Sequence, residues 1–327
     1  MLIIVETYSS SCYSIDSIDN ININILLKGG TQMELRVLQY FLAIAREQSI
    51  VRAAESLHLS QPTLSTQIKN MEEELGKQLL IRGTKGSRKV TLTEEGMILR
   101  KRAEEILALV KKTESEITLS DNIIMGDVYI GTGETDAVRL IARAAKTLQK
   151  SHPGVHFHIS SGNADFVKEQ LDKGLIDFGI VFGNVDFTKY NALKMSDKDI
   201  WGVLMRRDSP LAQKESVTPE DLWDKPLIMS QQENRGGDIT SWLKREASEL
   251  NIVATYNLMF NASLLVEEGL GYVIGLDHII NTSGDSSLCF RPLEPKLENE
   301  LSIIWKKYQI FSKPAKKFIE VLQEYLK

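Results

Sequence analysis

The chain has 327 residues and a formal net charge of −5, and this length is enough for two or three domains with true cores. Its two cysteines, Cys12 and Cys289, lie in unrelated segments, so we expect neither a disulfide framework nor a metal knuckle. This cysteine usage is typical of a cytoplasmic protein. No apolar run approaches the ~20 residues that a membrane span needs, which excludes a helical membrane protein.

The first 32 residues form a segment of their own. Residues 8–27 are rich in Ser, Asn and Ile without a coherent period, and the short apolar opening lacks the basic residues of a secretion signal. One set of codons for Lys28–Thr31 would spell a ribosome-binding sequence just ahead of Met33. We therefore expect residues 1–32 to be a non-native or disordered extension translated from a misplaced start. A genuine arm, disordered or strand-forming, is the alternative.

Two short amphipathic segments joined by a tight turn, between Ser49 and Glu74, predict a helix-turn-helix. In the second segment, apolar residues recur at helical spacing and face a core, while a small polar face points away. Ser60 is placed as an N-cap and Pro62 lies in the first turn, so this helix begins abruptly. A recognition helix inserts such an N-terminus into the major groove. Duplex DNA is the leading partner, and a plain helical hairpin is the alternative.

Apart from Pro62, the residues expected to contact DNA carry three kinds of side chain: amides, hydroxyls and cations. An amide can pair with adenine through two hydrogen bonds, hydroxyls can donate or accept, and cations can reach phosphate. Downstream, two alternating strands flank a Gly-containing basic tip, which predicts a wing that binds phosphates or enters a minor groove. A solvated hairpin tip is the alternative. The residues expected to contact DNA are Gln61, Pro62, Ser65, Thr66 and Lys69 in the helix, and Arg82, Lys85, Arg88 and Lys89 in the wing.

Residues 33–96 resemble the winged helix-turn-helix of LysR-type transcriptional regulators, a bacterial family. The resemblance rests on the pattern A-A-x-x-L-H-x-S-Q-P-x-L-S-x-Q-I followed by E-E-E-L-G. It implies that Gln61, Pro62 and Ser65 approach the bases. Thr66 stands where the family often has Arg, which puts one phosphate or guanine contact in question but does not affect the fold.

Residues 93–119 contain no Pro and a single Gly, and their apolar residues alternate at spacings of four and three. This pattern predicts a long helix with a heptad seam; packing onto its own domain is the alternative. In the resembled family this helix pairs two subunits. Two paired DNA-binding domains, or reading heads, can recognise a spaced, partly palindromic operator. The expected dimerisation residues are Leu99, Ala103, Ile106, Val110 and Ile117.

Beyond the linker, strands and helices alternate in two sets, which predicts parallel strands with crossover helices. Two such α/β lobes joined by crossing strands form the architecture of periplasmic binding proteins, and the resemblance implies an effector-sensing domain here. The fold class is therefore α+β multidomain. The predicted parts are a winged helix-turn-helix at 33–92, a linker helix at 93–120, and an effector domain at 121–327 with lobe I at about 127–203 plus 294–327 and lobe II at about 204–293.

Ligands of open α/β sheets bind beyond the carboxyl ends of strands, at helix N-termini. Such donors suit a carboxylate, the common effector type in the resembled family, whereas Glu134 and Asp136 favour an amine; an amino acid would satisfy both. Turn or capping duty is the alternative for each residue. The expected effector-binding residues are Thr132, Gly133, Glu134, Thr135, Asn163, Phe182, Gln231 and Asn261.

The sequence contains no P-loop, nucleophile elbow or zincin helix, and its G-x-G lacks the third glycine of a dinucleotide fingerprint. We expect no enzymatic activity, no cofactor and no metal. The prediction is a sequence-specific transcriptional regulator, a homodimer or homotetramer, that binds operator DNA and a small carboxylate or amino acid, with RNA polymerase as a further candidate partner and no membrane. A solute-binding protein with a helical dimerisation module and a ligand-independent architectural DNA binder stay open as alternatives.

Overall fold

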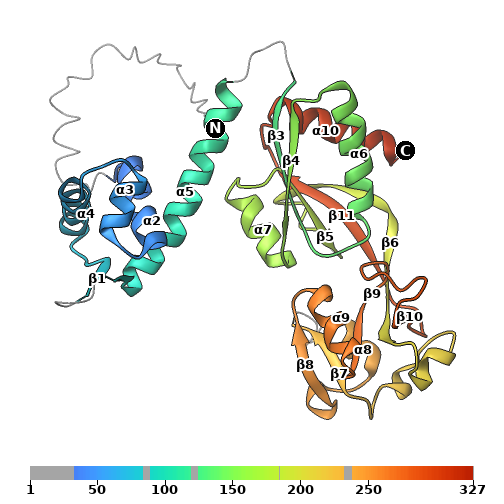
Figure 1. The fold of residues 1–327 in the computed structure, drawn as a ribbon. Coiled ribbons are helices and arrows are strands. Elements are labelled where there is room, and N and C mark those ends of the chain that lie inside the picture. The colour runs from blue at the N-terminus through green and yellow to red at the C-terminus, as the bar shows by residue number, and fades with distance from the viewer. Residues whose placement is uncertain (1–32, 84–88, 119–123, 184, 232–237, 327) are drawn as a thin grey trace, which may run out of the picture. The chain divides into compact units, whose positions relative to one another are not determined.

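The computed structural model describes residues 33–83, 89–118, 124–183, 185–231 and 238–326 (Figure 1). The chain divides into two compact units, residues 1–108 and 109–327, which we describe separately. The expected extension at 1–32 and two of the predicted wing cations, Lys85 and Arg88, lie outside the described residues.

Three helices of the first unit form a bundle. In chain order they are α2 (Leu35–Glu47), α3 (Ile50–Ser56) and α4 (Gln61–Leu75). Phe41, Ile44, Leu64 and Ile68 are fully buried in its core. Phe41 and Ile44 are three positions apart on α2, and Leu64 and Ile68 are four positions apart on α4. Each pair therefore falls on one face of its helix. The apolar stripe predicted for the second segment of the helix-turn-helix therefore faces this core.

Serine caps define where the two helices of the helix-turn-helix begin. The Ser49 side chain accepts a hydrogen bond from the backbone N–H of Arg52, and Ser60 accepts one from Thr63 at 3.2 Å. Gly76 ends α4 in a left-handed conformation with φ of 62°, which glycine adopts without a steric penalty. The α4 N-terminus is thus fixed by local chemistry.

Two short strands follow the bundle. They are β1 (Leu80–Arg82) and β2 (Val90–Leu92), which pair antiparallel as the predicted wing. The next helix, α5 (Glu94–Thr118), contains the boundary between the two units. Its Leu99 and Ala103 are buried in the core of the first unit. For these two residues of the predicted dimerisation seam, packing onto their own domain is what the structure has.

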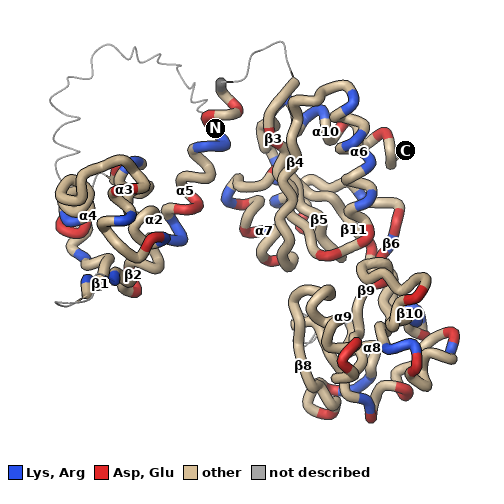
Figure 2. Tube along the Cα trace, viewed as in Figure 1, with Lys and Arg blue, Asp and Glu red and all other residues tan. Residues whose placement is uncertain are grey.

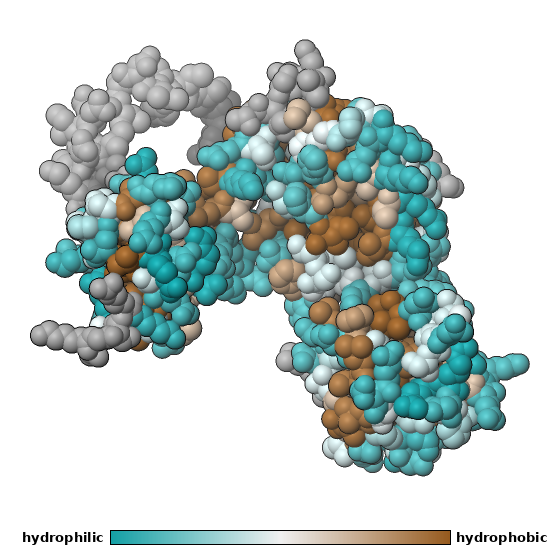
Figure 3. All heavy atoms as spheres, in the orientation of Figure 1, coloured by the Kyte–Doolittle hydropathy of each residue, from teal (hydrophilic) through white to brown (hydrophobic). Residues whose placement is uncertain are grey.

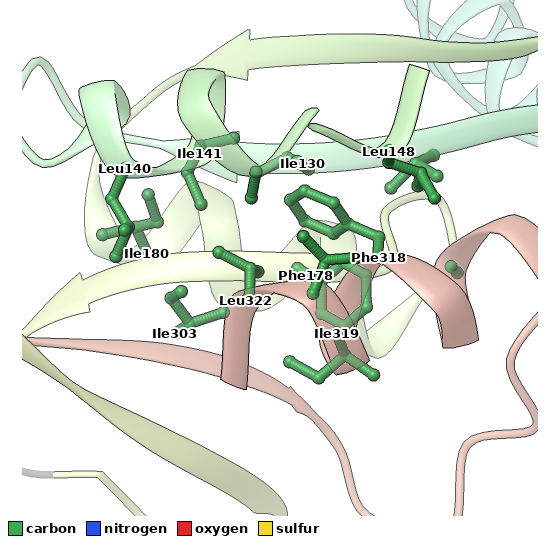
Figure 4. Packing of buried hydrophobic residues seen from close by; sticks show 14 of the residues in the cluster. Ile130, Leu140, Ile141, Leu148, Phe178, Ile180, Ile303, Phe318, Ile319 and Leu322 are labelled. Carbon is green, nitrogen blue, oxygen red and sulfur yellow. The ribbon is translucent and has the colours of Figure 1, made fainter. Parts of the chain in front are cut away.

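Lobe I of the second unit is a five-stranded sheet in the order β4-β3-β5-β11-β6, in which β6 spans Tyr190–Arg206. Strands β3, β4 and β5 are parallel, whereas β11 is antiparallel to β5 and β6. Phe178, Ile303, Phe318 and Leu322 meet in its core, between the sheet and two helices (Figure 4). The elements are β3 (Gly126–Thr132), α6 (Val138–Ser151), β4 (Val155–Ser161), α7 (Ala164–Asp172), β5 (Phe178–Phe182), β11 (Glu298–Lys306) and α10 (Lys313–Tyr325).

Lobe II continues the sheet through β6, β9, β7 and β8, with β10 also paired to β6. Its elements are β7 (Leu227–Ser230), α8 (Asp238–Leu243), β8 (Ile252–Tyr256), α9 (Met259–Glu267), β9 (Tyr272–Leu276) and β10 (Leu288–Pro292), with short 3-10 turns at Pro210–Gln213, Pro219–Asp221 and Ala247–Glu249. Helix α9 carries apolar residues on several sides, so Phe260 and Leu264 remain exposed. Apolar surface is visible over this lobe in Figure 3.

The long strand β6 (Tyr190–Arg206) belongs to both lobes. Up to Ile200 it pairs with β11 of lobe I, and from Trp201 it pairs with β9 of lobe II. The two halves of the sheet therefore join between residues 200 and 201, three residues before the boundary that we predicted from the sequence.

Candidate functional site

The N-terminal end of α4 presents polar side chains to solvent. Gln61, Pro62, Thr66 and Lys69 are exposed, and Ser65 is half-buried. The opposite, apolar face of the same helix is buried in the core. This division leaves a blunt, polar helix end available for a groove of duplex DNA.

Glu72 fastens the wing to α4, a role that the sequence did not reveal. One carboxylate oxygen accepts the backbone N–H groups of Leu79 and Leu80 at 2.8 and 3.0 Å. The other accepts from the guanidinium of Arg82 at 3.1 Å. Arg82 is thereby positioned while its side chain stays 43% exposed, so it can still face a phosphate.

Two further predicted DNA contacts lie at the surface. Lys69 pairs with Glu73 at 3.3 Å, and both side chains are about two-thirds exposed; such a pair contributes little stability and can give way to a phosphate. Lys89 is exposed directly before β2. Figure 2 shows basic positions in blue near the labels of the two wing strands; Arg82 ends β1, and Lys89 directly precedes β2.

The residues predicted to bind an effector differ in burial and in hydrogen bonding. Asn163 is the N-cap of α7 and accepts from the backbone N–H of Phe166 at 2.7 Å, so the capping alternative holds for it. Gln231 and Asn261 are exposed. Phe182, at the end of β5, packs against the main cores of both lobes. Phe182 therefore lies where the two lobes meet.

The loop after β3 reaches the other lobe. Thr132 and Thr135 are buried, and Gly133 lies between them. The Glu134 carboxylate accepts a hydrogen bond from the backbone N–H of Met259, the first residue of α9. The loop thus joins lobe I to a helix N-terminus of lobe II, where a negative charge is favoured.

Asp199, near the sheet junction on β6, was not among the predicted site residues. Its side chain is buried, and burial raises its pKa to about 6, with nearby Asp136 adding to the rise and a hydrogen bond from the Thr135 hydroxyl opposing it. Loop and strand therefore converge on one acidic position at the lobe junction.

A second buried acid, Asp177, binds the C-terminal part of α5 within the second unit. Lys112 donates to Asp177 at 2.8 Å and to the carbonyl of Gly174 at 3.1 Å. The other Asp177 oxygen accepts from the backbone N–H of Tyr129 at 2.8 Å. Both Lys112 and Asp177 are buried, so this end of the linker helix is tied to lobe I by a fully partnered ion pair.

The sequence matches two protein families. Residues 35–97 match the bacterial regulatory helix-turn-helix protein, lysR family, and residues 124–327 match the LysR substrate binding domain. The second match alone covers more than half of the chain. The chain belongs to the LysR family of transcriptional regulators. The predicted fold class, the DNA-binding head and the effector-binding domain are confirmed.

Relatives of this LysR regulator match from 60% to 90% of its length. The Hca operon transcriptional activator HcaR of Escherichia coli is 29% identical over 90% of this chain and 98% of its own. A hydrogen peroxide-inducible genes activator of Pectobacterium carotovorum is 30% identical over 60% of this chain and 64% of its own. The crystal structure of CbnR, a LysR family regulator, has a TM-score of 0.70 at 18% identity, covering 90% of this chain and all of its own, which supports the fold.

LysR-family proteins are transcriptional regulators rather than enzymes. None of the helices described for this LysR regulator is both long and apolar enough to cross a membrane. Across the described ranges, no group of three or more His, Cys, Asp or Glu side chains is arranged to hold a metal ion.

Proposed function

We propose that this LysR regulator reads operator DNA with the N-terminal end of α4 and grips phosphates with its wing. The observation that carries this proposal is the exposure of a polar α4 N-terminus whose apolar face is fully buried. The proposed base-reading residues are Gln61, Pro62, Ser65 and Thr66, and the proposed phosphate contacts are Lys69, Arg82, Lys85, Arg88 and Lys89.

Two subunits pair, in this proposal, along α5. With Leu99 and Ala103 buried in their own unit, the stripe left for a partner is Ile106, Val110 and Ile117, of which Ile106 and Ile117 are exposed. Beside it in the first unit lies a hollow of about 470 Å³ that a second helix can fill. Its lining residues are Gln39, Leu42, Ala43, Arg46, Leu57, Arg100, Glu104 and Leu107. Homodimers of this kind can assemble further into tetramers.

The effector is proposed to bind at the lobe junction, against the loop from Thr132 to Thr135 and Phe182. A ligand that prefers one arrangement of the lobes would shift the population of the oligomer toward one spacing of its reading heads. That shift changes DNA bending and the access of RNA polymerase. In this scheme the protein works in the cytoplasm, without catalysis.

Operator binding can be tested by fluorescence anisotropy of the full chain on the DNA immediately upstream of its own gene, against a shuffled duplex at the same salt. We expect a preference of ~10³ or more for the upstream DNA. Gln61→Ala should lose most of that preference. Glu74→Ala is the matched control, because it is exposed at the far end of α4, about 20 Å along the helix.

Equal affinity of the wild type for the two duplexes would contradict sequence-specific reading and favour the architectural binder. Full preference retained by Gln61→Ala would remove the proposed role of the α4 N-terminus while leaving the family assignment in place.

A further inference from the structure

Two buried side chains on one face of β6 carry polar atoms without a partner. Asp199 and Trp201 lie two positions apart on the strand, so they point to the same side of the sheet. They are 4% and 6% exposed. Among the described residues, neither Oδ2 of Asp199 nor Nε1 of Trp201 has a hydrogen-bond partner. Such atoms are costly to leave unpaired in a folded protein, which indicates that something else satisfies them.

Among the described residues, no positively charged group acts on Asp199. The Thr135 hydroxyl hydrogen-bonds to its carboxylate, and the charge of Asp136 acts on it through repulsion. Arg139, the cation closest in sequence to this loop, is committed to an ion pair with Asp136 at the surface. The junction therefore holds a buried acid whose charge the described side chains leave uncompensated.

The place at which an anionic ligand would bind is filled by the chain itself. Helix α9 directs its N-terminus toward lobe I, and Glu134 accepts the backbone N–H of Met259 there. A carboxylate ligand would have to displace Glu134 and would meet two further acids, Asp136 and Asp199. Among the described residues, the junction lacks a hydrogen-bond donor for Asp199 and a hydrogen-bond acceptor for the indole N–H of Trp201.

We infer that the effector of this regulator carries a protonated amine, which pairs with Asp199, and an oxygen acceptor, which receives the indole N–H of Trp201. This inference rests on the proposed effector site at the lobe junction and names the ligand class that the site takes. Glu134 takes the role of the effector carboxylate, as a built-in anion at the N-terminus of α9. An acid that lacks an amine is excluded by the same three carboxylates.

The test uses the full chain and two commercial probe sets with the same range of side chains. The first set consists of amino acid amides, which have a cationic amine and a neutral carbonyl. The second consists of N-acetyl amino acids, which have a carboxylate and no amine. Thermal unfolding is measured with each probe at 10 mM. At least one amide should raise the unfolding temperature by about 3 °C, the size expected when a ligand is well above its Kd, and the N-acetyl acids should not.

Three substitutions separate this inference from general stabilisation. Asp199→Asn should abolish the shift caused by the amide, whereas Asp197→Asn, exposed on the same strand, should retain it. Trp201→Phe should weaken the affinity for the amide about fivefold, the loss of one hydrogen bond.

Stabilisation by the N-acetyl acids alone would overturn the inference. An amide that raises the unfolding temperature of Asp199→Asn as much as that of wild type would also overturn it. The same holds if no amide raises the unfolding temperature of a preparation that binds its upstream DNA, because the unpartnered atoms would then bind buried water only. If the preparation fails to prefer its upstream DNA but responds to amides through Asp199, the ligand class stands and the proposed operator reading fails.

Discussion

The buried carboxyl of Asp199 should make the protein less stable at neutral pH than it would be without that charge. Burial raises the pKa of this group from 3.8 to about 6 in the folded state. The folded protein therefore binds a proton that the unfolded chain has already released between these pH values. Because stability falls with rising pH wherever the folded state holds more protons, the loss develops between about pH 4 and pH 6 and persists above that range.

The size of the effect follows from the two pKa values. A tenfold difference in proton affinity corresponds to about 1.36 kcal/mol, so the charged Asp199 costs about 3 kcal/mol at pH 7.5 and about 1 kcal/mol at pH 4.5. Asn cannot ionise, and the cost of its own unpaired N–H₂ is the same at both pH values. The stability of Asp199→Asn relative to wild type should therefore be about 2 kcal/mol more favourable at pH 7.5 than at pH 4.5.

Thermal unfolding of wild type, Asp199→Asn and Asp197→Asn at the two pH values measures this difference. For a unit of about 200 residues, ~2 kcal/mol corresponds to about 4–8 °C in the unfolding temperature. Asp197 is exposed on the same strand, so its substitution should follow wild type at both pH values. A gap between Asp199→Asn and wild type that does not change with pH would refute the reasoning, since it would mean that Asp199 titrates normally in the folded protein.

Three further predictions concern other parts of the chain. Lys112→Ala leaves the Asp177 charge buried with one donor fewer, so urea unfolding should show a loss of about 3 kcal/mol; a loss below ~1 kcal/mol would mean that water reaches the pair. Ser65→Ala should relax discrimination at one base step by about 1–3 kcal/mol. Lys69→Ala should instead weaken binding to all duplexes and lower the slope of log affinity against log salt concentration by about one. Equal losses for Ser65→Ala on operator and random DNA would contradict base reading. Burial raises the pKa of the Cys289 thiol, so hydrogen peroxide should leave operator affinity unchanged in a Cys12→Ser background; an effect abolished by Cys289→Ser would show that the thiol reacts.

Local patterns predicted the reading head well because its determinants are close together in the sequence. The N-cap at Ser60, the buried stripe that includes Leu64 and Ile68, and the two strands of the wing all depend on spacings of a few residues. The spacing of apolar residues along the linker helix was also predicted, but the surface against which each residue packs was not. Leu99 and Ala103 fit a heptad as well as they fit the core of their own unit, and sequence spacing cannot distinguish the two.

The features that the sequence did not predict depend on contacts between distant segments. Glu72 is one of three consecutive glutamates, and only its position beside β1 makes it the anchor of the wing. Lys112 and Asp177 are 65 positions apart, and Glu134 meets Met259 across the two lobes. In each case the residue type is ordinary and the tertiary fold assigns its role.

Asp177 and Asp199 show why burial alone does not mark a functional residue. Both aspartates are buried in the second unit. Asp177 has Lys112 on one oxygen and the Tyr129 backbone on the other, so its charge is compensated by the fold and the ion pair serves the structure. Asp199 has an oxygen that the described residues leave unpartnered, and the fold bears that cost in the absence of a ligand. A ligand that supplied the missing donor would recover the cost as binding energy, and would do so only in the arrangement of the lobes that buries the acid. The unsatisfied acid is therefore the one suited to couple effector binding to the lobes, and the satisfied one is suited to hold the linker helix to lobe I.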